Sequence, residues 1–238
     1  MEVHNHGHHE GKKTWKSYSW EFIMLFIAVF CGSLAEWQLE HVIENQREKE
    51  YIHSMISDLQ EDVAQTDEIL RNHDLLNQRI DSLLVELSSD NITTNSNKAY
   101  QLWLKTRGFQ DFFQNDRTIQ QLKSSGALRL IRKKGVSDKI MEYDQTVRKL
   151  YTTQEMYNTF LIDNATYNQF FDFLEFRKQN TPLRPIPLTE KGKKMVNEVY
   201  ANRIFWKQGI AILIKRNKLV NQESKKTIEF IKDKYKIQ

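Results

Sequence analysis

The sequence has few of the residues that interrupt helices or cross-link small domains. Its 238 residues include only 8 glycines, 3 prolines and 1 cysteine. All three prolines lie within residues 182–187, so almost nothing outside this stretch opposes helix formation. The single cysteine, Cys31, cannot form a disulfide within the chain. These shortages predict an all-α fold without a disulfide framework.

Recognisable catalytic and metal-binding motifs are also missing from the sequence. It contains no nucleophile elbow, phosphate-binding loop, dinucleotide fingerprint or paired-cysteine metal site. All 7 histidines lie at or before His73, and we expect His41, His53 and His73 to be solvated helix residues. Acidic neighbours such as Glu61 and Asp62 do not face each other on a helix. We therefore predict no catalytic, cofactor or metal site, and a protein that is not an enzyme. A hydrolase built from carboxylates of separate helices is the alternative.

The first 17 residues are polar and contain four histidines, His4, His6, His8 and His9. Imidazole is a common metal ligand, and alternate histidines can bind a divalent metal. Nothing nearby in the sequence fixes their geometry. We therefore predict a tail with incidental metal affinity rather than a metal site.

One long apolar run stands out against this polar background. Residues 22–35 are 14 residues without a charge, and counting from Tyr18 to Leu39 gives 22 residues. At 1.5 Å per residue the longer segment spans about 33 Å, which suits a hydrocarbon core of about 30 Å. Tyr18, Trp20 and Trp37 are interface-type aromatics at its ends. The sequence thus predicts a transmembrane helix at residues 18–39, with the lipid bilayer as its partner.

Two alternatives to a retained span stay open. Ser33-Leu34-Ala35 has the small-x-small pattern of a signal-peptide cleavage site. Against cleavage, the helical pattern continues without turn residues, and Glu21 borders the apolar region. A buried soluble helix is the other alternative, although no other segment is apolar enough to surround it. A lipid anchor on Cys31 is disfavoured because Phe30 precedes it, where a small residue is expected.

The charges that flank the span indicate an orientation. Three lysines precede it, whereas Arg47 and Lys49 after it are diluted by four glutamates within residues 40–50. The positive-inside bias then places the N-terminus in the cytoplasm and residues 40–238 outside. In a bacterium with two membranes, this predicts a single-pass protein of the inner membrane with a periplasmic C-terminal domain.

The remaining residues predict a helical bundle. Apolar residues recur at helical spacing over three long helices at about 40–87, 136–178 and 189–220. The first would continue directly from the span as a stalk, and its stripe comprises Ile52, Ile56, Leu59, Val63, Ile69, Leu76, Ile80, Leu83 and Leu87. Polar residues 88–97 and the proline loop 182–187 separate the helices. We expect residues 40–238 to form one antiparallel bundle.

Two connecting segments invite a functional interpretation. Phe109, Phe112 and Phe113 form an aromatic cluster, for which core packing is favoured over a ligand box. Gly126 follows two serines and can take a left-handed turn. With the cations of residues 132–134 this stretch could cradle an anion, but it lacks phosphate-loop spacing. A tight helix–helix corner is the favoured interpretation.

Charge is distributed unevenly along the chain. Residues 36–90 carry 14 acidic and 4 basic residues, whereas residues 191–238 carry 13 basic and 4 acidic residues. The favoured explanation is that the first and last long helices lie side by side and neutralise each other. An anionic membrane surface or nucleic acid is the alternative partner of the basic end. We predict no nucleic-acid partner.

Two stretches together resemble a known family. The first is the membrane segment with Glu21, Gly32 and Ala35, followed by Arg47, Glu50-Tyr51-Ile52, Asp58-Leu59 and Asp62. The second comprises Thr118-Ile119, Leu122, Ser124-Ser125-Gly126, Leu128, Leu130-Ile131, Ile140 and Tyr143. They resemble a domain of unknown function found in single-span membrane proteins, mainly of Bacteroidota. The chain departs from the family pattern by placing Trp37 close to the span and by its longer histidine-bearing tail. The resemblance implies an uncleaved inner-membrane anchor and a helical extramembrane domain, and it implies no activity.

These features favour a membrane-anchored helical interaction or scaffold protein with an unknown protein partner. Ala28 and Gly32 form a small-xxx-small pair, with Ala35 near the same face, which would allow a homodimer through the span. Small residues without a role in helix packing are the equal alternative. The alternative function is an extracytoplasmic bundle that senses a ligand and acts through a partner.

Overall fold

The computed structural model describes residues 15–163, 167, 169–179 and 184–237 of the chain. Within these ranges it contains six α-helices, a 3-10 helix at Ala127–Leu130 and no strand, so the all-α prediction is confirmed. The histidine-bearing tail lies outside the described residues. The chain divides into two compact units, residues 1–50 and residues 51–238. The second unit therefore begins 11 residues later than residue 40, the predicted start of the bundle.

The described part of the first unit is helical from residue 15 to residue 50, within helix α1 (Trp15–Leu87). Its apolar side chains are exposed, including Phe22 at 68%, Leu25 at 66% and Val29 at 64%. Among the described residues, α1 is the one helix long and apolar enough to cross a membrane, with an 18-residue window of mean hydropathy 1.8 that has no buried residue. By length and composition, this segment fits a single transmembrane span.

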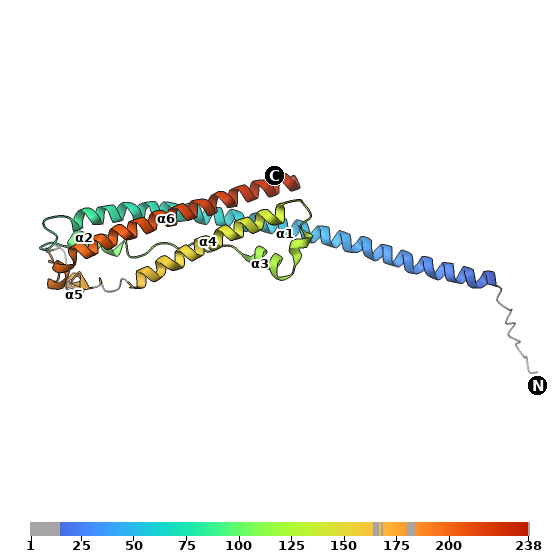
Figure 1. Cartoon of the computed structure of the whole chain (residues 1–238), viewed down its shortest axis with the longest axis horizontal. Coiled ribbons are helices and arrows are strands. Elements are labelled where there is room, and N and C mark those ends of the chain that lie inside the picture. The colour runs from blue at the N-terminus through green and yellow to red at the C-terminus, as the bar shows by residue number, and fades with distance from the viewer. Residues whose placement is uncertain (1–14, 164–166, 168, 180–183, 238) are drawn as a thin grey trace, which may run out of the picture. The chain divides into compact units, whose positions relative to one another are not determined.

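The second unit is a bundle of long helices, formed by residues 51–87 of α1 together with α4 (Val136–Asp163) and α6 (Glu190–Tyr235) (Figure 1). Ion pairs between Lys207 and Asp81 and between Lys225 and Asp67 show that α6 runs antiparallel to α1. Helices α4 and α6 are also antiparallel, since Lys139 meets Glu223 near the start of α4. The expectation that the acidic and basic helices lie side by side is thus confirmed.

Four short elements connect the long helices of the bundle. They are α2 (Asn97–Leu104), α3 (Arg117–Ser124), the 3-10 helix η1 (Ala127–Leu130) and α5 (Phe173–Lys178). Helices α2 and α5 lie at one end of the bundle, and α3 lies at the other end (Figure 1). The connector 105–116 returns along the bundle between α2 and α3.

The main core is built from the helical apolar stripes. Residues of α1, α4 and α6 supply most of it, with Phe112 of the connector and three residues of α3 and η1. The fully buried members include Ile52, Leu59, Ile69, Ile80, Phe112, Ile119, Leu122, Val136, Ile140, Tyr143, Val147, Leu150, Trp206, Ile210 and Leu213. Because these side chains fill the interior, this unit has a hydrophobic core of its own.

A second, smaller core lies around α2 and α5, where the sequence predicted an uninterrupted helix at 136–178. That prediction is wrong, because α4 ends at Asp163 and α5 is a separate helix that begins at Phe173. Phe170 and Phe171 are buried between these helices, and Trp103 of α2 packs on Phe171 with ring centroids 5.6 Å apart. Leu174 of α5, in contrast, is 62% exposed.

The last helix is longer than predicted. Helix α6 ends at Tyr235 rather than at about residue 220. Thr189 is its N-cap, and the Thr189 hydroxyl accepts a hydrogen bond of 2.8 Å from the backbone N–H of Gly192. Residues 184–187 of the proline stretch, the part that the structure describes, are not helical.

Candidate functional site

Two buried carboxylates on α1 form the centre of the most extensive polar network in the described bundle. Asp58 and Asp62 are four residues apart, so they project from the same face of the helix. Asp58 is 2% exposed and Asp62 is 0% exposed. Burial of a charged carboxylate is costly unless hydrogen bonds compensate, so the partners of each oxygen decide what this pair can do.

Asp58 holds the N-terminus of α3. Its Oδ2 accepts a hydrogen bond of 3.1 Å from the backbone N–H of Thr118, in the first turn of α3. Its Oδ1 accepts a hydrogen bond of 3.2 Å from Nη2 of Arg117. The N-cap residue Asp116 makes no capping hydrogen bond of its own, so a carboxylate from another helix satisfies a free N–H of α3. Asp58 is therefore an N-cap supplied through tertiary structure.

Asp62 joins the connector before α3 to helix α4. Its Oδ1 accepts hydrogen bonds from the backbone N–H of Asn115 at 2.8 Å and from the Asn115 side-chain amide at 3.0 Å. Its Oδ2 accepts a short hydrogen bond from the hydroxyl of Tyr143. Tyr143 is 0% exposed and belongs to α4. A single side chain thus connects three parts of the bundle.

The surroundings of the Asp62–Tyr143 pair shift the pKa values of both side chains. Burial raises the pKa of Asp62 above its usual 3.8, and the negative charge of Asp58 acts in the same direction. Hydrogen bonds from Tyr143 and Asn115 partly offset this rise in the pKa of Asp62. Burial also raises the pKa of Tyr143, with a further contribution from the charge of Asp62. The phenol therefore stays a proton donor to the carboxylate, which is the opposite of an activated nucleophile.

Helix α6 closes the same network on its other side. The Thr66 hydroxyl donates to the carbonyl of Asp62 at 2.7 Å. The side-chain amide of Asn221 donates to Thr66 Oγ1 at 2.8 Å and to Asp67 Oδ1 at 2.9 Å. Asn221 is 6% exposed, so these bonds lie away from bulk water. The network therefore ties α6 to the same two turns of α1.

Comparison with known proteins gave no further assignment. No protein-family model, curated protein or solved structure matches the chain. The resemblance to the Bacteroidota family stays a prediction. The two stretches that carry it nevertheless meet in the fold, because Asp58 binds the start of α3 and Asp62 binds Tyr143.

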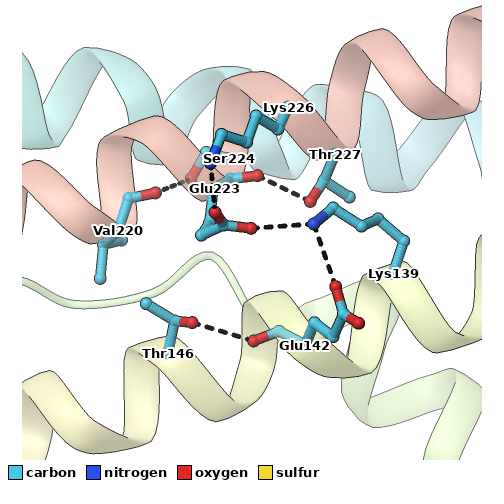
Figure 2. A network of polar contacts seen from close by, with 8 residues as sticks. All are labelled: Lys139, Glu142, Thr146, Val220, Glu223, Ser224, Lys226 and Thr227. Atoms are coloured by element: carbon cyan, nitrogen blue, oxygen red, sulfur yellow. Dashed lines mark hydrogen bonds and ion pairs between the residues drawn. The ribbon is translucent and has the colours of Figure 1, made fainter.

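A second polar cluster connects α4 with α6 nearer to the start of α4 (Figure 2). Lys139 Nζ lies 2.9 Å from Glu223 Oε2 and 3.0 Å from Glu142 Oε2. Lys226 contacts the other oxygen of Glu223 at 2.8 Å. The hydrogen bond to Glu223 raises the pKa of Lys139, and the hydrogen bond from Lys226 lowers the pKa of Glu223. The four charges cancel, so this cluster acts as a contact between helices rather than as a charged site.

The solvent exposure of His73 differs from the prediction. It was expected to be solvated, but its side chain is buried at 1% exposure, so that prediction is wrong. Its Nε2 donates to the backbone carbonyl of Gln110 at 3.1 Å, while Nδ1 has no hydrogen-bond partner among the described residues. Burial lowers the pKa of His73 below 6.5. Its place between Ile69 and Leu76 on the apolar stripe was the signal that the sequence offered.

Arg203 is a buried cation that the sequence did not single out. It is 4% exposed, and its guanidinium lies 4.2 Å from the ring centroid of Trp103. Its Nη2 donates to Asn202 Oδ1 at 2.8 Å, and burial lowers the pKa of Arg203 to about 10. Arg203 follows Val199 by four residues and precedes Trp206 by three, so the helical period alone places it on the core face.

The predictions for the Gly126 turn and for the aromatic connector 109–113 have different outcomes. Gly126 has φ +67°, which confirms the left-handed turn at the corner between α3 and η1. The Ser125 hydroxyl donates to the carbonyl of Gln121 at 2.6 Å and accepts from the N–H of Ala127 at 3.3 Å, so it is used within the turn itself. In the aromatic connector, Phe112 is buried in the core, but Phe113 is 69% exposed. Core packing is therefore correct for Phe112 and wrong for Phe113.

The chemistry of the Asp58–Asp62 network follows from these contacts. Every carboxylate oxygen already accepts a hydrogen bond from a backbone or side-chain donor. Asp62 has no exposure to solvent, and an open polar pocket reaches only Asp58, between Ser54, Ser57 and Gln121. Among the described residues no group of three or more His, Cys, Asp or Glu side chains is placed to hold a metal ion. The geometry thus suits a clamp that fixes helix positions.

Proposed function

We propose that this protein is a membrane-anchored helical scaffold that presents its bundle to a protein partner. The observation that carries the proposal is the contrast between the two units. Residues 18–39 expose a continuous apolar surface, whereas residues 51–238 bury their own apolar stripes in a separate core. A helix with uncovered apolar side chains over this length is stable in a bilayer rather than in water.

The free energy of insertion supports a retained span. On the translocon scale the leucine, isoleucine, valine and phenylalanine side chains of residues 22–34 favour insertion by roughly 2–5 kcal/mol. Glu21 and Glu36 lie near the ends, where a charge costs less than at the bilayer centre. In this proposal the N-terminus is cytoplasmic, the bundle is periplasmic and the protein sits in the inner membrane.

The span also offers a contact between two copies of the chain. Ala28, Gly32 and Ala35 are small residues, and no other atom lies within 4 Å of a Cβ placed on Gly32. Small residues at this spacing let helix backbones approach closely in a bilayer. A homodimer through these residues belongs to the proposal, and Gly32→Leu is expected to lower crosslinking between Cys31 side chains in membranes.

Extraction of membranes with alkaline carbonate tests the anchor. The double substitution Phe26→Arg/Val29→Arg places two charges at the centre of the span, at about 3 kcal/mol each, which outweighs the favourable insertion energy. We expect wild-type protein to stay in the pellet and this variant to be lost from it. The matched control Val42→Arg/Ile43→Arg puts the same charges beyond the span and should stay in the pellet.

The mass of the natural protein checks the signal-peptide alternative. A retained span requires that the mature chain contain residues 18–39. A mature chain that begins at Glu36 and is found in the soluble fraction would overturn the proposal.

A ligand sensor is the second candidate function. The observation that favours it is the open polar pocket between α1 and α3, lined by Ser54, Ser57, Asp58, Arg117, Thr118 and Gln121. A small polar ligand there would act on the start of α3, which Asp58 holds. Thermal-shift screening of the full chain in detergent discriminates the two functions. A stabilising metabolite whose effect is lost in Gln121→Leu favours the sensor, and its absence across a broad set favours the scaffold.

A further inference from the structure

One end of the bundle gathers basic residues from two separate elements. This end consists of Tyr51 of α1, the start of α4 and the last turns of α6. The contacts Asp62–Tyr143 and Lys139–Glu223 hold these three helices together near it. Figure 1 shows the C-terminus and the turn that precedes α4 at the same end. A Cβ built on Gly135 would lie 3.5 Å from the ring of Phe230, so the turn packs on α6.

The charge at this end is one-sided. Residues 117–137 contain 6 basic and 0 acidic residues. We define the basic end as Arg129, Lys133, Lys134, Lys232 and Lys234. Arg129, Lys133 and Lys134 are exposed, and none of the three forms an ion pair with another described residue. Arg129, Lys133 and Lys134 therefore contribute three positive charges that no ion pair within the described residues neutralises, although Asp138 and Asp233 also lie at this end.

Internal electrostatics explain only part of this charge. Lys232 and Lys234 lie in the last turn of α6, where cations compensate the helix dipole, and Lys234 also lies 5.1 Å from the Phe230 ring centroid. Lys133 and Lys134 lie three and two residues before Val136, the first residue of α4. The positive end of a helix dipole disfavours cations, so these two lysines are placed against the local field. An external anionic surface would reverse that penalty.

We propose that the basic end of the bundle binds the anionic headgroups of the membrane in which the chain is anchored. This inference rests on the proposed anchor at residues 18–39. Tyr51, at this end, follows Leu39 by 12 residues, and a chain of that length spans at most about 40 Å. The end of the bundle at which α1 enters this unit thus carries the basic end, and it is tethered within reach of the headgroups.

The chemistry of the basic end suits lipid headgroups. Clusters of lysine and arginine beside a span are attracted to anionic lipids. Tyr235 and Phe230 lie partly buried beside the basic residues, and aromatic rings are favoured at the headgroup level. A tethered surface also meets the membrane at high effective concentration, so weak contacts suffice. A nucleic acid is disfavoured because no comparable tether would hold it there.

Headgroup proximity in nanodiscs tests the inference with the full chain. In a Cys31→Ser background, a dye on Ser124→Cys reports the basic end and a dye on Ser82→Cys reports the opposite half of the bundle. Both serines are exposed. Discs contain phosphatidylcholine alone or with phosphatidylglycerol, and each carries a spin-labelled headgroup lipid as quencher. We expect quenching of the dye at position 124 in anionic discs, little in neutral discs, and its loss at 1 M salt, where the Debye length is about 3 Å.

The substitution pair Lys133→Gln/Lys134→Gln tests the residues themselves. A lysine near an anionic surface changes binding about fivefold, so the pair should lower the ratio of bound to unbound bundle about 25-fold. The matched control Lys191→Gln/Lys194→Gln removes two exposed lysines from the start of α6 and should not change the quenching.

The outcomes separate the inference from the anchor on which it depends. Quenching that is equal in neutral and anionic discs, or unaffected by Lys133→Gln/Lys134→Gln, would overturn the inference while leaving the anchor intact. Chain that fails to enter either kind of disc would overturn the anchor and the inference together.

Discussion

The hydroxyl of Tyr143 on α4 donates a hydrogen bond to the carboxylate of Asp62 on α1, across 81 residues of sequence. Both side chains are fully buried. A carboxylate in such a place is tolerated because Tyr143 and Asn115 supply donors to both of its oxygens. The pair therefore holds α1 and α4 in one register, and changes to either partner should be felt in stability.

Tyr143→Phe tests this pair directly. It removes the donor to Asp62 Oδ2 while keeping the ring, so a buried acceptor is left without its partner. We expect the free energy of unfolding to fall by about 1–3 kcal/mol, measured by urea denaturation of the detergent-solubilised protein. Tyr151→Phe is the matched control, because Tyr151 is 37% exposed and water can replace its contact with the N–H of Gln114. An equal effect of the two substitutions would contradict a special role for the Asp62–Tyr143 pair.

The pH dependence of stability should carry the signature of Asp62. Its pKa is raised in the folded state, so the folded chain holds the proton more tightly than the unfolded chain. The stabilisation is therefore complete below about pH 4, the ordinary carboxyl pKa, and is lost as pH rises through the folded pKa. The measurement is the difference in unfolding free energy between wild type and Asp62→Asn, which does not titrate. As pH rises above 4, wild type should lose stability relative to Asp62→Asn. A gain in the relative stability of wild type would contradict the raised pKa of Asp62.

His73 should give the opposite trend at higher pH. Burial depresses its pKa below 6.5, so the folded state disfavours the charged imidazole. Its contribution to stability is present above pH 6.5 and is lost as pH falls through the folded pKa. His73→Gln keeps a donor for the carbonyl of Gln110 but cannot titrate. Between pH 7 and pH 5 wild type should lose stability relative to this variant, and parallel curves would contradict the assignment.

Addition of a methyl group at Gly192 should lower stability. A Cβ at this position would lie 2.2 Å from the backbone oxygen of Phe170, which cannot rotate away. Alanine usually stabilises a helix by about 1 kcal/mol relative to glycine, but overpacking here should reverse the sign. We expect Gly192→Ala to lower stability by about 1–3 kcal/mol in thermal or urea denaturation. Gly108→Ala, where no atom lies within 4 Å of the added Cβ, is the control and should be close to neutral.

Periodic patterns predicted most of the core from sequence. Ile52, Leu59, Ile69, Ile80 and Leu83 recur at helical spacing and are all buried. The same helical period places His73 and Arg203 on core faces, whereas their polarity indicates exposure. Both are buried because Gln110 accepts a hydrogen bond from His73 and the ring of Trp103 lies against Arg203. Long-range partners of this kind do not appear in a single-sequence pattern.

The break after α4 was missed for a different reason. No glycine or proline lies between Val136 and Lys178, so the usual helix-breaking residues are absent from this stretch. Burial of Phe170 and Phe171 against α2 outweighs local helix propensity. A local signal did exist, because Asp172 accepts a hydrogen bond of 3.0 Å from the N–H of Glu175 and the two residues have capping-box spacing.

The polar network was beyond sequence reasoning because its members are distant. Asp58 reaches Thr118 across 60 residues, and Asn221 reaches Thr66 across 155 residues. The sequence singled out Asp58 only through the family resemblance, and Asp62 through that resemblance and as an acidic neighbour of Glu61. Their roles come from backbone and side-chain donors that lie on three other segments.

The separation of 155 residues between Thr66 and Asn221 has a consequence for biosynthesis. At about 5–20 residues per second, a ribosome needs roughly 8–30 s to make the chain between them. During that interval the apolar stripe of α1 cannot pack against α6, because α6 has not yet been made. The emerging polypeptide is therefore open to aggregation until the last helix has been made.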